Sequence, residues 1–277
     1  MLIEYKKAYL LVQKYPKIMQ SKIYKEPELK EPYMVTGLPG IGYVAKLSMD
    51  YLIKELKAEL FEELYSPSFP PYVLIKKDGT VELLKNEFYY WKDTRSRNDL
   101  IIFTGNTQAI SPEGQYEVTY EALNRAEKFK VKKLIATAAY VTGKYVEKPK
   151  VYGVVSDPEL LDDLKKYDII PMDAGSISGT NGLLFGLAKL RGIQSLCLLS
   201  ETPGYMTPSG RVLTDVKAAQ ALLEVLSKML DIKIDTKPLE KEAKMAEEFV
   251  QKLEELERRW IEEMRKSVTP PPKDIYL

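Results

Sequence analysis

The sequence of 277 residues has no histidine, one cysteine and no long apolar run. Without histidine the chain lacks the commonest general base and nitrogen metal ligand, which excludes Ser-His-Asp and Cys-His catalytic sites. The lone Cys197 excludes an intrachain disulfide and a multi-cysteine zinc site, and its apolar neighbours in SLCLLS predict a buried packing residue. No segment approaches the roughly 18 apolar residues of a membrane span, and the charged N-terminal segment is not typical of a signal peptide. We therefore expect a cytoplasmic protein.

Charge of either sign is not in excess, because 41 Lys and Arg residues face 40 Asp and Glu residues. This balance argues against a nucleic acid or an anionic membrane as partner. The 45% hydrophobic content excludes a wholly disordered chain. Abundant Lys and Glu, with few Asn, Gln and Cys, are typical of a thermophilic protein.

Short apolar runs alternate with helix-like segments through residues 1–235, which is typical of βαβ units. A three-layer α/β core is the expected fold. Asp78 and Gly79 form a turn signal between two apolar runs and predict an inserted β-hairpin. Asp157 and Pro158 predict a helix start, with the aspartate as N-cap. The predicted strands are PYMVTG, DLIIFTG, KKLIATAAYV, VYGVVS, DIIPMD and SLCLLS, and the predicted helices cover residues 43–56, 115–129, 158–167, 181–191 and 214–230.

The residues 236–267 differ from this core, because they predict one long helix. A helix from 239 to 267 would be about 43 Å long. Such a helix either lies back on its own domain or protrudes and meets another molecule, and we favour the second. Its first apolar positions follow the 4,3 spacing of a coiled-coil seam: Leu239, Ala243, Ala246, Val250 and Leu253.

Residues 268–277, VTPPPKDIYL, form a third segment. Three consecutive prolines end the helix and favour an extended polyproline II spacer. Beyond the spacer stand Ile275, Tyr276 and Leu277. Apolar side chains beside a carboxylate are typical of a peptide that another protein binds in a pocket. The tripeptide is thus the candidate partner-binding site.

Two glycine-rich loops, GLPGIG and GSISGTNG, each follow a predicted strand and precede a helix. Backbone N–H groups of such loops can hold a phosphate, although neither spacing is that of a dinucleotide site or a P-loop. The alternative is that the glycines permit tight turns and close packing. In a parallel sheet these loops and the loop 201–205 would gather at one edge. The candidate ligand residues are Gly37, Gly40, Gly42, Gly179 and Gly182.

Carboxylates near these loops are the available acids and bases for an enzyme: Asp173, Glu201 and Asp215. Each is more simply a helix cap or a solvated loop residue. No acidic cluster has the spacing of a Mg²⁺ or Ca²⁺ site. We therefore expect no enzyme, no cofactor and no metal.

Three motifs resemble the proteasome assembly chaperone family in its archaeal branch: TGLPGIGYVAKLSMDYLI, GSISGTNGLLFGLAKLRGI and CLLSETPGY. They occur in order across roughly residues 30–230. The resemblance implies a Rossmann-like fold akin to nucleoside phosphorylases, used as a protein-binding scaffold without catalytic residues. It also implies homo-oligomers, and we expect a tetramer.

The tripeptide at 275–277 resembles the hydrophobic-Tyr-X motif that proteasome activators and chaperones dock into pockets of the 20S proteasome α-ring. By this resemblance Ile275 would fill an apolar groove, Tyr276 would pack its ring, and Leu277 would present the carboxylate to a lysine of the α subunit. Several tails on one oligomer would raise the effective concentration. The first hypothesis is therefore an ATP-independent proteasome assembly chaperone or activator.

Two other hypotheses remain open. One is an enzyme or sensor that binds a nucleotide, a phosphate or a nucleoside-like ligand at the glycine loops. The other is a structural oligomer whose long helix bundles with its copies. A thermal shift with nucleotides would favour the first of these two, and loss of oligomerisation on truncation at Pro238 would favour the second.

Overall fold

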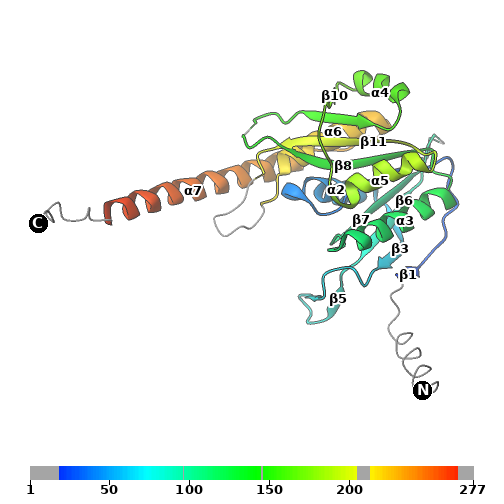
Figure 1. Ribbon diagram of the computed structural model, residues 1–277, viewed down its shortest axis with the longest axis horizontal. Helices are drawn as coiled ribbons and strands as arrows, with labels where there is room; N and C mark the ends of the chain where they lie inside the picture. The colour runs from blue at the N-terminus through cyan, green and yellow to red at the C-terminus, as the bar shows by residue number, and fades with distance from the viewer. Residues whose placement is uncertain (1–18, 96, 145, 205–212, 268–277) are drawn as a thin grey trace, which may run out of the picture.

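The computed structural model describes residues 19–95, 97–144, 146–204 and 213–267, and it consists of a mixed sheet between two layers of helices, with a helical arm (Figure 1). This is the predicted three-layer α/β arrangement. The nine strands run in the order β1 (Gln20–Ile23), β3 (Glu59–Tyr65), β6 (Asn86–Trp91), β7 (Leu100–Gly105), β2 (Tyr33–Thr36), β8 (Lys133–Val141), β11 (Gln194–Thr202), β9 (Val151–Val155) and β10 (Ile170–Pro171).

The centre of the sheet is parallel, because β7, β2, β8 and β11 run in the same direction. All six residues of β7 are buried, as expected of an apolar run covered on both faces. Both margins are antiparallel: β1, β3 and β6 on one side, and β9 against β11 on the other. At that margin β10 pairs in parallel with β9, so both of these strands run against the central ones.

Each face of the sheet carries its own apolar core. On one face α3 (Pro112–Lys128) packs beside α5 (Gly179–Leu190), and on the other α2 (Val44–Leu56) packs beside α6 (Val216–Leu230). Alternate residues of β2 serve the two faces: Met34 belongs to the first core and Val35 to the second. The predicted helices are confirmed with shifts of a few residues at their ends.

Two helices begin at side-chain caps. Ser111 accepts a hydrogen bond from the Gly114 N–H, and Asp215 accepts one from the Ala218 N–H at 3.0 Å. Asp157 is the N-cap residue with Pro158 after it, as predicted, but its carboxylate accepts from Ser156 Oγ at 2.6 Å and makes no capping bond. The helical segment after Asp157 begins with a 3₁₀ turn (Pro158–Leu160) and continues as α4 (Leu161–Lys166).

The predicted hairpin is confirmed as β4 (Val73–Ile75) and β5 (Val81–Leu83), which form a separate two-stranded sheet. Gly79 in the turn has φ +80°, a backbone conformation that favours glycine. Asp78 Oδ1 accepts from the N–H and the hydroxyl of Thr80, which closes the turn.

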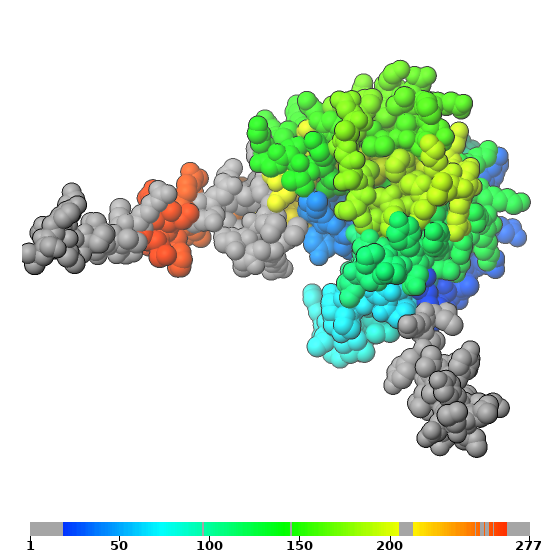
Figure 2. Space-filling view, in the orientation of Figure 1, coloured from blue at the N-terminus to red at the C-terminus, as the bar shows by residue number. Residues whose placement is uncertain are grey.

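The long helix α7 (Lys237–Ser267) lies on its own domain at its start and protrudes from it farther on, so each of the two alternatives holds for one part of the helix. Leu239 and Ala243 are buried against the second core, and the Tyr51 hydroxyl donates to the Asp235 carbonyl just before the helix. Farther on, α7 leaves the domain as an arm (Figures 1 and 2). Among the described residues no helix is long and apolar enough to cross a membrane. The boundaries 1–235, 236–267 and 268–277 stay a prediction.

Candidate functional site

The two glycine-rich loops meet at the carboxyl edge of the parallel strands, as the sequence predicts. Leu38 N–H donates to Asn181 Oδ1 at 3.0 Å, and the Asn181 amide donates back to Leu38 O at 3.2 Å. Gln108 links the same loops, because its Nε2 donates to Pro39 O and its Oε1 accepts from Thr180 N at 2.9 Å. These bonds occupy two backbone N–H groups that a phosphate would need.

Gly37 and Gly182 serve close packing rather than ligand binding. A Cβ at Gly37 would lie 2.6 Å from the Ala45 carbonyl oxygen, and one at Gly182 would lie 2.0 Å from that of Ile177. Neither backbone atom can move without shifting its element. At these two positions the packing alternative accounts for the glycine.

The other glycines differ in their surroundings. Gly42 and Gly179 have φ of +59° and +77°, where side chains are strained. Gly40 has only distant neighbours, the nearest at 3.9 Å, and lines a cavity. A glycine inside a predicted helix, as at Gly186, suggests close approach of a neighbouring element, but nothing lies within 4 Å of a Cβ there, so that expectation is wrong.

A cavity of about 430 Å³ lies between the loops. None of the described residues that line it is charged, so a phosphate would meet no cation there. The geometry favours an uncharged, partly polar occupant, and phosphate binding stays a prediction. The lining residues are Gly40, Ile41, Ala45, Gln108, Gln115, Ala138, Ala139, Ser176, Ile177, Ser178, Gly179, Asn181 and Leu199.

Asp215 links the third loop to the first. Its Oδ2 accepts from Thr202 Oγ1 at 2.7 Å, its Oδ1 caps α6, and its backbone N–H donates to Gly42 O at 2.8 Å. Both carboxylate oxygens therefore have structural partners. The three predicted loops do gather at one edge, but Asp215 serves their packing.

The other two candidate acids also have structural or solvent-exposed positions. Glu201 is buried and accepts from Lys150 N and from the Tyr152 hydroxyl, both at 2.9 Å. Asp173 is exposed. Within the described ranges no group of three or more acidic or cysteine side chains is placed to hold a metal ion.

Cys197 is fully buried in β11, as predicted. Burial raises the pKa of its thiol to about 12, so the reactive thiolate is almost absent at neutral pH. The residue is a packing group, not a nucleophile.

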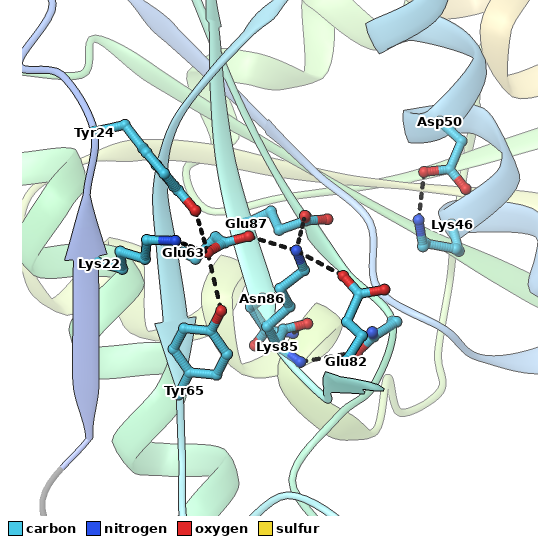
Figure 3. Close-up of polar contacts among 11 residues, drawn as sticks. Lys22, Tyr24, Lys46, Asp50, Glu63, Tyr65, Glu82, Lys85, Asn86 and Glu87 are labelled. Atoms are coloured by element: carbon cyan, nitrogen blue, oxygen red, sulfur yellow. Dashed lines mark hydrogen bonds and ion pairs between the residues drawn. The ribbon is translucent and has the colours of Figure 1, made fainter. Parts of the chain in front are cut away.

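A polar cluster at the base of the hairpin, which the sequence did not indicate, joins three strands (Figure 3). Lys85 Nζ contacts Glu63 of β3, Glu82 of β5 at 2.9 Å and Glu87 of β6 at 3.1 Å. Burial lowers the pKa of Lys85, but hydrogen bonds to the three carboxylates outweigh it and raise the pKa above its ordinary value. The cluster anchors the hairpin to the main sheet.

Glu63 is the most buried carboxylate of this cluster. It also accepts from the Tyr24 hydroxyl at 2.6 Å and the Tyr65 hydroxyl at 2.9 Å. Burial raises the pKa of Glu63, but the hydrogen bonds from Lys85 and the two tyrosines outweigh it and lower the pKa to about 2. Burial and this carboxylate in turn raise the pKa of Tyr65 to about 12.

Replacing Glu63 with Gln should lower the free energy of unfolding at pH 7 by about 2 to 3 kcal/mol, because Lys85 then loses its nearest counter-charge. Because the pKa of Glu63 is lower in the folded chain, its carboxylate stabilises the fold at pH values above the unfolded pKa of 4.5. This contribution is lost as the pH falls toward about 2. The difference between variant and natural chain should therefore shrink over that window in urea titrations. The exposed Glu26→Gln serves as control and should change little; equal losses for both variants would contradict the account.

The arm α7 is the second candidate contact surface. Past its attachment to the domain it exposes large apolar side chains: Met245, Phe249, Leu256, Trp260, Ile261 and Met264. Two residues of the predicted coiled-coil seam, Leu239 and Ala243, pack against the domain's own core and are not available to another helix. The candidate docking residues Ile275, Tyr276 and Leu277 lie outside the described residues.

Two solved structures of Pyrococcus furiosus proteins are similar to this chain. PbaB of Pyrococcus furiosus, an archaeal proteasome activator, is 38% identical with a TM-score of 0.80, and the match covers 86% of this chain and 99% of PbaB. PbaA of the same organism, an archaeal homolog of proteasome-assembly chaperone, is 29% identical with a TM-score of 0.68, over 86% of this chain and 97% of PbaA.

A protein of Methanocaldococcus jannaschii, uncharacterized protein MJ1210, is 38% identical over 257 residues, which are 92% of this chain and 94% of that protein. The PAC2 family profile matches residues 34–254. This range contains all three motifs on which the resemblance depends. The chain belongs to the PAC2 family.

Proposed function

We propose that this chain is a proteasome assembly chaperone or activator that binds the α-ring of the archaeal 20S core particle. The observation that carries the proposal is its likeness to PbaB, an archaeal proteasome activator, at 38% identity and a TM-score of 0.80. The likeness covers nearly the whole of PbaB. We also expect the chain to act in the cytoplasm of a thermophilic organism.

Docking through residues 275–277 is the finer part of the proposal. The arm α7 supports it, because it ends at Ser267 away from the sheet and the helices that cover it (Figure 1). Ten further residues with three prolines can span roughly 30 Å. One such peptide binds weakly, so a homotetramer with four tails would gain affinity through effective concentration.

The proposed chaperone or activator needs neither ATP nor a catalytic site. The sequence has no P-loop, the described lining of the glycine-loop cavity has no charged group, and the candidate acids have structural partners or face solvent. Binding energy alone would then shift the α-ring toward an assembled or open state.

The test is peptide hydrolysis by purified archaeal 20S proteasome with and without this protein, each with and without ATP. An activator should raise the rate by the same factor in both conditions. An assembly chaperone should leave that rate unchanged and instead accelerate ring formation from free α subunits. No effect in either assay would overturn the proposal.

The cavity between the glycine loops favours a second candidate function, a small-molecule sensor. Its uncharged polar lining suits a nucleoside-like ligand better than a phosphate. Nucleosides should then raise the melting temperature more than inorganic phosphate or nucleotides do. No shift with any of them would exclude this candidate.

A further inference from the structure

The hairpin of β4 and β5 exposes an apolar face. Val73 pairs with Leu83 and Ile75 pairs with Val81, so these four side chains lie on one side of the two-stranded sheet. All four side chains are exposed: Val73 by 46%, Leu83 by 57%, Ile75 by 79% and Val81 by 66%. We call these four residues the outer face. It contains no polar or charged side chain.

The opposite side of the hairpin is turned toward the protein's own polar cluster. It carries Leu74 and Glu82, which face each other across the strands. The Glu82 carboxylate lies 2.9 Å from Lys85 Nζ, and Lys85 in turn contacts Glu63 of the main sheet. The hairpin therefore has one side attached to the domain and one side directed outward. Figure 2 shows the hairpin protruding beyond the main body.

An outer face of this kind needs permanent cover. A two-stranded hairpin alone is marginally stable in water, and exposed aliphatic strands are prone to aggregate. Together with Tyr72 the outer face exposes on the order of 600 Å², more than the scattered apolar residues of an ordinary surface. A partner that binds only transiently would leave the hairpin bare for most of the protein's life.

We propose that the outer face is an interface between two copies of this chain, packed face to face about a twofold axis. A second copy is the partner that is always present when the chain folds. Two copies of this surface, with Tyr72 included and fully covered, would bury on the order of 1,200 Å² in total, the lower limit for a stable specific interface. The absence of charge on the face suits an obligate contact, which is more apolar than a transient one.

The base of the hairpin offers a place for the partner's tip. A cavity of about 320 Å³ adjoins the outer face and is lined mainly by apolar groups, among them Phe69, Pro70 and Leu84. In an antiparallel crossing of two hairpins, Ile75 near the tip of one copy lies over the base of the other. Its side chain is the most exposed of the face and would fill this cavity.

This interface deepens the oligomer part of the proposed function, since each pair of copies would carry two tails. It requires no proteasome. Its test therefore uses the full chain alone, while the proposed function is decided by proteasome binding and hydrolysis. Failure of one can be told from failure of the other.

The first experiment measures molar mass by sedimentation equilibrium. Ile75→Glu should reduce the mass of the natural oligomer to one half or to the 31.7 kDa of one chain. The matched control is Leu190→Glu, because Leu190 is also 79% exposed but lies at the end of α5. It should leave the mass unchanged. A natural chain of 31.7 kDa, or an unchanged mass for Ile75→Glu, would overturn the interface.

A second experiment avoids the risk that a charge unfolds the hairpin. Ile75→Cys and Leu190→Cys are each treated with a maleimide; the native thiol Cys197 is fully buried and stays unmodified in the folded chain. The thiol at position 75 should react much more slowly than the one at position 190, because the partner's cavity covers it in the oligomer. Equal labelling rates for both variants would contradict the proposal.

Discussion

Removing residues 275–277 should weaken binding to the archaeal 20S proteasome by about 100-fold or more, with the fold and the oligomer mass unchanged. Each tail is expected to bind weakly alone, so simultaneous binding of several tails multiplies the affinity. The removed residues lie beyond Ser267, where α7 ends away from both cores. Surface-immobilised proteasome and a concentration series of each chain give the two affinities.

The matched control for this truncation is Lys273→Ala, which changes the same tail outside the tripeptide. Tyr276→Ala should reproduce most of the loss, because the ring is expected to make the largest contact. Undiminished affinity of the truncated chain would contradict docking through the tail, even if the protein binds the particle by another surface.

Gly182→Ala should destabilise the fold by about 3 kcal/mol, whereas Gly186→Ala should stabilise it by up to about 1 kcal/mol. Both glycines lie in α5, so both gain the same helix propensity from alanine. A Cβ at position 182 would lie 2.0 Å from the Ile177 carbonyl oxygen, while nothing lies within 4 Å of one at position 186.

Chemical denaturation of the two variants and the natural chain measures this difference. Since Gly182 holds the second glycine loop against its helix, its replacement should also loosen the cavity between the loops. Similar stabilities for Gly182→Ala and Gly186→Ala would contradict the close approach of Ile177 to α5.

The sequence predicts best those elements whose surroundings are uniform. The run at β7 is buried on both faces, and such a strand needs only apolar residues. The hairpin turn is set by Asp78 and Gly79, whose preferences are local. The sequence also predicts the two glycine loops at one edge, but the reason differs for the second loop. That loop follows β10, which runs against the central strands, and the start of α5 brings it to the first loop.

Contacts between distant strands could not be predicted in the same way. The antiparallel orientation of β9 depends on pairing with β11, and no local signal encodes it. The cluster of Lys85 with Glu63 unites residues that in sequence look like ordinary solvent-facing charges. The hydrogen bonds of the Asn181 and Gln108 side chains to the backbone of the first glycine loop likewise join segments far apart in the chain.

The most direct test of the proposed function is co-sedimentation of the full chain with purified archaeal 20S proteasome. The account predicts that the protein pellets with the particle in a saturable amount, without added ATP. If the protein stays in the supernatant with the intact particle, and also fails to associate with free α subunits, the account is contradicted.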